Sequence, residues 1–171
     1  TEIAFKALVI SILAHALYKS ALFLTAGIVD HETGTRDLRR LGGLARAMPF
    51  TATAATISGL SMAGLPPLFG FLAKETQLAT AVHPSLPPII NALFPLVIVA
   101  AGALLLGQGG LFVYDVFFKR PADSKHVVRG HEPRWGMWLA PMIPAVISLA
   151  VGVLPEPEFL AAFLAHAATA T

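Results

Sequence analysis

The 171-residue chain is 56% hydrophobic and 13% charged, with a mean hydropathy of +0.71; this composition is typical of a membrane protein and excludes an ordinary soluble domain. Most of its basic residues fall in two loops, so the net charge of +2 indicates membrane topology rather than nucleic-acid binding. Because the sequence contains no cysteine, disulfides and thiolate metal sites are excluded.

The apolar segments predict an all-α integral membrane fold with about four transmembrane helices, one of them discontinuous. The predicted spans are, in chain order, residues 3–28, 50–83, 88–118 and 135–154. Each is long enough to cross a hydrocarbon core of roughly 30 Å. Residues 1–154 thus form the membrane domain, and 155–171 are interpreted as a connector or truncated tail. The chain starts at Thr1 without a signal-peptide pattern, so we expect a piece of a longer polypeptide.

The second span contains the stretch "GLPPLFGFLAKE", which predicts a helix break at residues 64–70. Proline removes backbone donors and glycine relaxes the chain, and the residues concerned are Gly64, Pro66, Pro67 and Gly70. Free carbonyl groups at such a depth are tolerated only beside protein or a water-filled cavity. Broken helices in mid-membrane recur at ion-transport sites.

Charge distribution predicts the topology of these spans. Residues 30–48 and 119–134 are both basic, and alternating spans put them on the same side of the membrane. The connections on the opposite face, "HPSLPP" and "PEPE", contain no lysine or arginine. By the positive-inside rule, loops 30–48 and 119–134 are predicted to be cytoplasmic.

Two lysines fall at an unusual depth. Lys19 lies nine residues before the predicted end of its span, and Lys74 lies nine residues before His83 at the opposite surface, so both fall about 14 Å from an end at the helical rise. A charged group there must face water or a partner, and a lysine that gains and loses a proton acts as a relay. The alternative is a structural role, with each lysine held in an ion pair or bonded to carbonyl groups of the broken helix.

Further polar residues could support a proton relay. His15 precedes Lys19 by one turn on the same helical face, and histidine titrates near neutral pH, so it is either a relay member or an ordinary core histidine. Ser11, one turn earlier, could hold a water molecule. Glu75 follows Lys74 directly, and their pairing stays open because neighbours on a helix point apart. Gln108 could hydrate a path or form a hydrogen bond between helices.

The sequence predicts no cofactor, no metal site and no catalytic residue. The remaining histidines are scattered, "GQGG" lacks the Gly-Lys-Ser/Thr that follows a phosphate loop, and no nucleophile stands near a base. The chain is therefore expected to be a transporter component rather than an enzyme.

Two long motifs resemble a known family. "HALYKSALFLTAGIVDHETGTRDLRRLGGLARAMP" and "SGLSMAGLPPLFGFLAKE" are similar to the proton-conducting subunits shared by complex I and the Mrp-type multisubunit cation/proton antiporters. Within this family, "DHETGTRDLRRLGGL" and "HEPRWGMWLAP" resemble the large A subunit of the Mrp antiporter. The likeness runs from about residue 11 to 154.

The resemblance implies a role for individual residues. Lys19 and Lys74 match the relay lysines of the second half-channel, with His15 between them and the water chain. Relatives in complex I often carry a second histidine where this chain has Ser11, which implies a water held by the serine instead. The first half-channel is expected upstream of Thr1.

The leading hypothesis is a part of an antiporter subunit that exchanges protons for a monovalent cation, sodium being the expected one. Its expected partners are other membrane subunits, the transported ions and the lipid bilayer of the bacterial inner membrane, and not nucleic acid. The first alternative is a proton-pumping subunit of a redox-driven complex, of the complex I (NADH-quinone oxidoreductase) or membrane-bound hydrogenase type. The second is a scaffold that transports nothing. Only the scaffold predicts that loss of Lys74 leaves transport intact.

Overall fold

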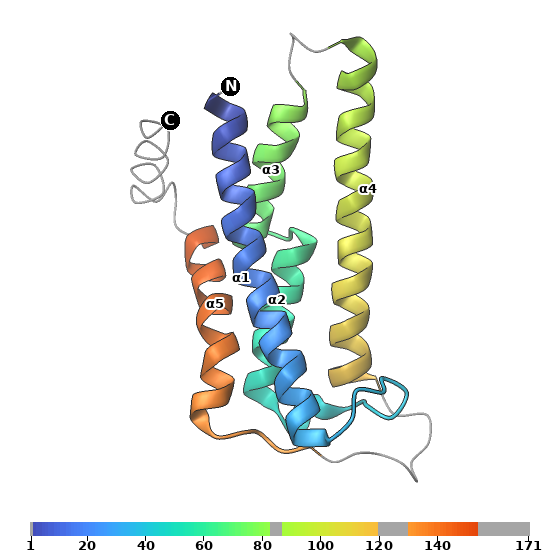
Figure 1. Cartoon of the computed structure of the whole chain (residues 1–171), viewed down its shortest axis with the longest axis vertical. Helices are drawn as coiled ribbons and strands as arrows, with labels where there is room; N and C mark the ends of the chain where they lie inside the picture. Colours follow the sequence, from blue (N-terminus) through green and yellow to red (C-terminus); the bar gives the residue numbers. More distant parts are fainter. Residues whose placement is uncertain (1, 83–86, 120–129, 154–171) are drawn as a thin grey trace.

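A computed structural model describes residues 2–82, 87–119 and 130–153 (Figure 1). All regular elements in these ranges are helical, which confirms the all-α class. They are α1 (Glu2–Thr33), the 3-10 turn η1 (Leu44–Arg46), α2 (Pro49–Ala63), α3 (Phe69–Ala81), α4 (Pro88–Val113), the π-helical segment η2 (Tyr114–Phe118) and α5 (Trp135–Val153). The expected tail, 155–171, lies outside the described residues.

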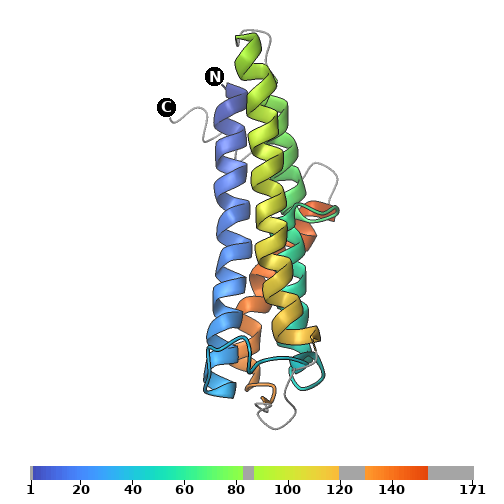
Figure 2. The same ribbon diagram turned by 90° about the vertical axis from the view of Figure 1, so that its right-hand side faces the viewer.

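Within the described residues, three helical stretches are long and apolar enough to cross a membrane, namely Ala4–Thr33, Pro88–Phe118 and Trp135–Val153. The fourth crossing is divided between α2 and α3, which have 15 and 13 residues and are each shorter than the roughly 20 residues of a full span. Together they run the length of the bundle as a discontinuous helix (Figures 1 and 2). The chain is a multi-pass membrane protein.

The first helix continues beyond the expected end at residue 28 and reaches Thr33. Its last turn is polar, but two of its acidic side chains find partners: Asp30 pairs with Arg36, and Glu32 pairs with His131. Gly34 then ends the helix with a φ of +67° while its N–H donates to the carbonyl of Asp30 at 2.8 Å. One contact near in sequence and one distant contact therefore accompany the polar last turn of α1, and hydropathy alone does not reveal them.

The break between α2 and α3 lies where proline and glycine predict it. Gly64 adopts a φ of +80°, and its N–H donates to the carbonyl of Ser61 at 2.9 Å, which closes α2. The helix resumes at Phe69. A Cβ on Gly70 would collide with the backbone carbonyl of Ser61, and a Cβ on Gly152 of α5 would collide with the carbonyl of Pro67. The break is thus packed tightly between α2 and α5.

The helices pack around α1, which contacts α2, α3 and α5, while α4 packs mainly on α2 (Figure 1). The buried cluster at one end joins α1, η1, α2 and η2 through Ile28, Leu44, Ala52 and Phe117. The outer side of α4 is apolar and uncovered, with Leu104 76% exposed. Residues 34–48 and 130–134 lie at the same end of the bundle, which is the arrangement that alternating spans require (Figure 1).

Candidate functional site

Lys74 turns back from α3 toward the end of α2. Its ammonium group donates a hydrogen bond to the carbonyl oxygen of Ala63, the last residue of α2. The side chain passes directly over Gly64, and Nζ would lie 3.3 Å from a Cβ placed on Gly102 of α4. The final carbonyl groups of a helix lack intrahelical donors and carry partial negative charge, so they favour a cation. The break therefore supplies a polar partner for Lys74 inside the bundle.

A cavity of about 60 Å³ lies beside Lys74. Besides Lys74, its polar lining consists of Ser11 and Tyr18 on α1, Ser61 on α2 and Gln77 on α3. A buried water needs roughly 10–15 Å³ and two to four polar partners, and the cavity offers both. The geometry is suited to holding water within reach of the lysine.

Ser11 and Gln77 form one wall of this cavity. The Ser11 hydroxyl donates to the carbonyl of Ala7 at 2.6 Å and accepts a hydrogen bond from Nε2 of Gln77 at 2.7 Å. Protein groups thus use the hydroxyl's one donor and one of its two acceptor positions, so the hydroxyl oxygen and the carbonyl oxygen of the Gln77 side chain can each still accept a hydrogen bond from water. The water-holding role expected of Ser11 stays a prediction, and Gln77 on α3 offers a second polar group beside it.

Tyr18 connects the cavity to His15. The Tyr18 hydroxyl lies 3.0 Å from Nδ1 of His15, and the two rings meet edge to face with centroids 5.2 Å apart. His15 is exposed and does not line the cavity, whereas Tyr18 does. The polar partner of His15 is therefore Tyr18, whereas the sequence suggests Lys19. In this arrangement His15 stands one hydrogen bond away from the cavity wall.

Lys19 lines a different cavity, of about 200 Å³, between α1 and α4. Gln108 of α4 is on the same lining, and Nζ of Lys19 lies 6.0 Å from the centroid of the Phe23 ring. Met62 of α2 is 2% exposed and lines both this cavity and the one beside Lys74. The two lysines are thus separated by a thioether side chain and do not share a cavity.

Glu75 takes no part in either cavity. It is exposed on α3, and across residues 2–82, 87–119 and 130–153 no ion pair joins it to Lys74. The same described residues contain no cluster of three histidine or acidic groups that could hold a metal ion.

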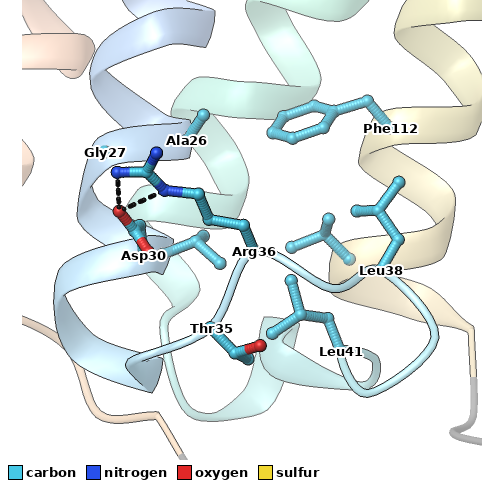
Figure 3. Close-up of a pocket in the computed structure, with 10 residues that line it drawn as sticks. Ala26, Gly27, Asp30, Thr35, Arg36, Leu38, Leu41 and Phe112 are labelled. Carbon is cyan, nitrogen blue, oxygen red and sulfur yellow. Dashed lines mark hydrogen bonds and ion pairs between the residues drawn. The ribbon is translucent and has the colours of Figure 1, made fainter.

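A third cavity, of about 320 Å³, opens where α1 ends, and Figure 3 shows Arg36 extending across it toward Asp30. Nη2 and Nε of Arg36 lie 2.7 and 2.8 Å from Oδ2 of Asp30. The hydrogen bond to this carboxylate, and secondarily its charge, raise the pKa of Arg36, so the guanidinium stays charged. The rest of the lining is mostly apolar and includes Leu41 and Phe112.

At the same end of the bundle, two glutamates connect segments that are distant in the sequence. The side chain of Glu32 is 6% exposed, and its two oxygens lie 3.0 Å from Nδ1 of His31 and 2.8 Å from Nδ1 of His131. Glu132 accepts hydrogen bonds from the N–H groups of Phe50 and Thr51 at 2.8 and 3.2 Å, which caps the start of α2. These contacts join the segment before α5 to α1 and α2.

Sequence reasoning missed Tyr18, Ser61 and Gln77. Tyr18 is adjacent to Lys19, and Gln77 is three residues after Lys74, so their nearness to the two lysines in the sequence could have identified them as site candidates. Ser61 is buried and its hydroxyl lies 2.8 Å from that of Ser148 on α5, a contact between residues 87 positions apart.

Residues 1–100 match the family described as "NADH:quinone oxidoreductase/Mrp antiporter, TM". The chain belongs to this transmembrane family. The match confirms the resemblance of the two long motifs, both of which lie within the matched residues.

Two curated relatives of this family member belong to antiporters by name. The A/B subunit of a probable K(+)/H(+) antiporter of Rhizobium meliloti is 44% identical over 158 residues, covering 91% of this chain and 15% of the relative. The A1 subunit of a Na(+)/H(+) antiporter of Staphylococcus aureus is 36% identical over 157 residues, covering 89% of this chain and 20% of the relative. The chain thus spans a fifth or less of the length of these relatives.

Two solved structures share the fold. The Mrp complex from Dietzia sp. DQ12-45-1b matches with a TM-score of 0.74 and 32% identity over 90% of this chain and 16% of that chain. The membrane-bound sulfane sulfur reductase, an archaeal respiratory membrane complex, matches with a TM-score of 0.75 and 29% identity over 92% of this chain and 25% of that chain.

Proposed function

We propose that this chain is part of a proton-conducting subunit of a cation/proton antiporter, and that its residues form the second half-channel of that subunit. The observation that carries the proposal is the position of Lys74, whose ammonium group meets the carbonyl end of α2 beside a small polar cavity. The names of the two antiporter relatives support the same assignment.

In the proposed relay, Lys74 exchanges a proton with water in the cavity beside it. The Ala63 carbonyl and the end of α2 favour the protonated lysine, while the tight apolar packing around the break favours the neutral one. Tyr18 can pass a proton between the cavity and His15 because its hydroxyl both donates and accepts.

Lys19 is the second proton-exchanging group of the proposed relay. Met62 lies between its cavity and that of Lys74, so transfer requires this side chain to move and admit water. Methionine is unbranched and has three rotatable bonds, so it is suited to such a movement. Gln108 offers polar atoms to water in the Lys19 cavity.

We further propose that the subunit lies in a bacterial inner membrane with other membrane subunits, and that the end carrying residues 30–48 and 119–134 is cytoplasmic. The exposed apolar side of α4 supports contact with lipid or with further protein. Sodium is the proposed cation, and the relatives' names make potassium the competing one.

The test replaces Lys74 with alanine in the full-length subunit, assembled with its partners in membrane vesicles. Proton movement driven by sodium and, separately, by potassium is recorded across pH 6–9, and assembly is checked in the same preparation. We expect exchange to be lost while assembly persists. Lys74→Arg keeps the charge but does not release its proton at these pH values, so it should also fail. Lys119→Ala, which removes a surface lysine paired with Asp115, is the matched control.

Different outcomes separate the alternatives. If Lys74→Ala loses exchange and Lys74→Arg retains it, the charge of Lys74 has a structural role. If Lys74→Ala itself retains exchange, the result agrees with the scaffold hypothesis. The likeness to a respiratory membrane complex favours the redox-driven pump as the second candidate. For that candidate, proton movement follows substrate oxidation and not a cation gradient, and neighbouring genes encode iron-sulfur or hydrogenase-like subunits.

A further inference from the structure

The three cavities lie one after another along α1 and α4. Going along α1, Ser11 and Tyr18 line the first cavity, Lys19 the second and Asp30 the third. On α4 and η2 the corresponding order is Leu105, then Gln108, then Val116. Each cavity therefore follows the previous one along both helices, from the helix break to the end where α1 finishes.

Neighbouring cavities share walls. Met62 separates the first from the second, and Ala26 and Phe112 line both the second and the third. Ala26 carries only a methyl group, and Phe112 is a partly buried ring that can rotate about its side-chain bonds. The Lys19 cavity and the third cavity thus meet at one aromatic side chain opposite a small residue.

Arg36 borders the outermost of the three cavities. Figure 3 shows its side chain running along one side of the cavity toward α1, where Asp30 holds the guanidinium, while Phe112, Leu38 and Leu41 lie on the other sides. The side chain of Arg36 is 86% exposed and that of Asp30 is 32% exposed. Exposed ion pairs are weak, so this contact separates readily.

We propose that the ion pair of Asp30 and Arg36 is the outer gate of a water-filled route that runs past Ala26 and Phe112 to Lys19. The route would connect Lys19 to the side of the membrane on which residues 30–48 lie. The proposal rests on the proposed function only in naming protons as what the route conducts. The cavities and their shared lining residues are observed independently of any transport. Asp30 then serves as the first carboxylate that an entering proton or hydronium ion meets.

Cysteine accessibility tests the route directly, because residues 1–171 contain no native cysteine. Ala26→Cys is introduced into the full-length, otherwise cysteine-free subunit, assembled in inside-out and right-side-out vesicles. The probe is a membrane-impermeant cationic methanethiosulfonate. We expect modification only from the side of residues 30–48, with a rate roughly fivefold higher when Arg36→Gln is added.

Three matched variants control the measurement. Ala55→Cys, which is 0% exposed, should stay unmodified, and Ala47→Cys in the exposed loop should react equally in every background. Arg39→Gln removes a neighbouring positive charge that is paired with Asp37 and does not line the cavity, so it should not accelerate modification of Ala26→Cys. This last control separates an opened gate from simple attraction of the cationic probe.

Each remaining outcome overturns the proposal. The route is contradicted if Ala26→Cys stays unmodified from both sides or reacts only from the opposite side. The gate is contradicted if Ala26→Cys reacts at the same rate with and without Arg36→Gln. The readout needs no transport, so loss or retention of exchange in Lys74→Ala leaves it unchanged. Failure of the relay and failure of the route are therefore distinguishable.

Discussion

The ammonium group of Lys74 donates a hydrogen bond to the carbonyl oxygen of Ala63, the residue at which α2 stops. The two residues belong to the two halves of one membrane crossing, and the break between them creates both the lysine's acceptor and the space for its side chain. A continuous helix would occupy the Ala63 carbonyl with its own N–H donor. The discontinuity therefore supplies Lys74 with a hydrogen-bond acceptor inside the bundle.

Gly64 should be intolerant of a side chain for two reasons. Its φ of +80° costs an L-residue about 1–2 kcal/mol, and a Cβ would collide with Cδ of Lys74. We expect Gly64→Ala to lower the thermal unfolding midpoint of the assembled complex and to reduce exchange, since Lys74 is pushed away from Ala63. Gly136→Ala is the control, because a Cβ there meets nothing within 4 Å. Unchanged exchange in Gly64→Ala would show that the contact of Lys74 with Ala63 is dispensable.

Tyr18→Phe isolates the contribution of one hydroxyl group. The change keeps the ring and its packing but removes the group that lies 3.0 Å from Nδ1 of His15 and faces the Lys74 cavity. We expect the exchange rate to fall by up to about 10²-fold, the lower end of what a positioned proton donor contributes, with assembly unchanged. Measured proton flux in vesicles checks this.

Tyr114→Phe, on an exposed tyrosine of η2, serves as the comparison for Tyr18→Phe. If both variants exchange at the parental rate, the contact between His15 and Tyr18 is structural and the proton path bypasses it.

The sequence predicts the helix break well because proline and glycine act locally. Gly64 needs no distant partner to favour a left-handed turn, and a lysine placed soon after such a break must meet the exposed carbonyl groups. The family resemblance follows from long contiguous motifs for the same reason. These features depend on residues that are neighbours in the chain.

The rest of the site depends on packing between helices and is not predictable from local sequence. Met62 has the apolar character of any core residue, and only the crossing of α1, α2 and α4 puts it between two cavities. Gln77 becomes a partner of Ser11 through the packing of α3 on α1, across 66 positions. The predicted end of α1 falls too early because the partner of Glu32 is the distant His131.

The Asp37 carboxylate provides a pH test of the loop that follows α1. Hydrogen bonds from the Arg39 side chain at 3.0 and 3.1 Å, and then from its backbone N–H, lower the pKa of Asp37 below its usual range. Because the folded loop favours the charged carboxylate, this contact stabilises the loop above the ordinary pKa of about 3.9 and is lost as the pH falls through the lowered value. Carboxyl ¹³C NMR on the reconstituted subunit measures the midpoint.

Arg39→Gln should move the Asp37 midpoint upward toward the ordinary value. Arg36→Gln, whose parent residue pairs with Asp30, should leave it in place. A midpoint at or above the ordinary value in the parental protein would contradict the observed pairing.

Glu132 should stabilise α2 from the far end of the chain. Its carboxylate accepts from two N–H groups at the start of α2 and from the hydroxyl of Thr51, which is fully buried. Glu132→Ala leaves these donors without their acceptor, at a cost of about 0.5–2 kcal/mol typical for a lost helix cap. We expect a lower unfolding midpoint and faster hydrogen exchange at the amides of Phe50 and Thr51.

Glu132→Gln should have a smaller effect, because an amide oxygen still accepts hydrogen bonds but lacks the charge that the helix N-terminus favours. Arg134→Gln, an exposed change two residues away, controls for disturbance of the segment and should leave both amides protected. Equal protection of Phe50 and Thr51 in Glu132→Ala and in the parental protein would mean that the cap contributes nothing to α2. The start of the helix would then depend on Pro49, which needs no donor at the first helical position, and on the burial of Met48 alone.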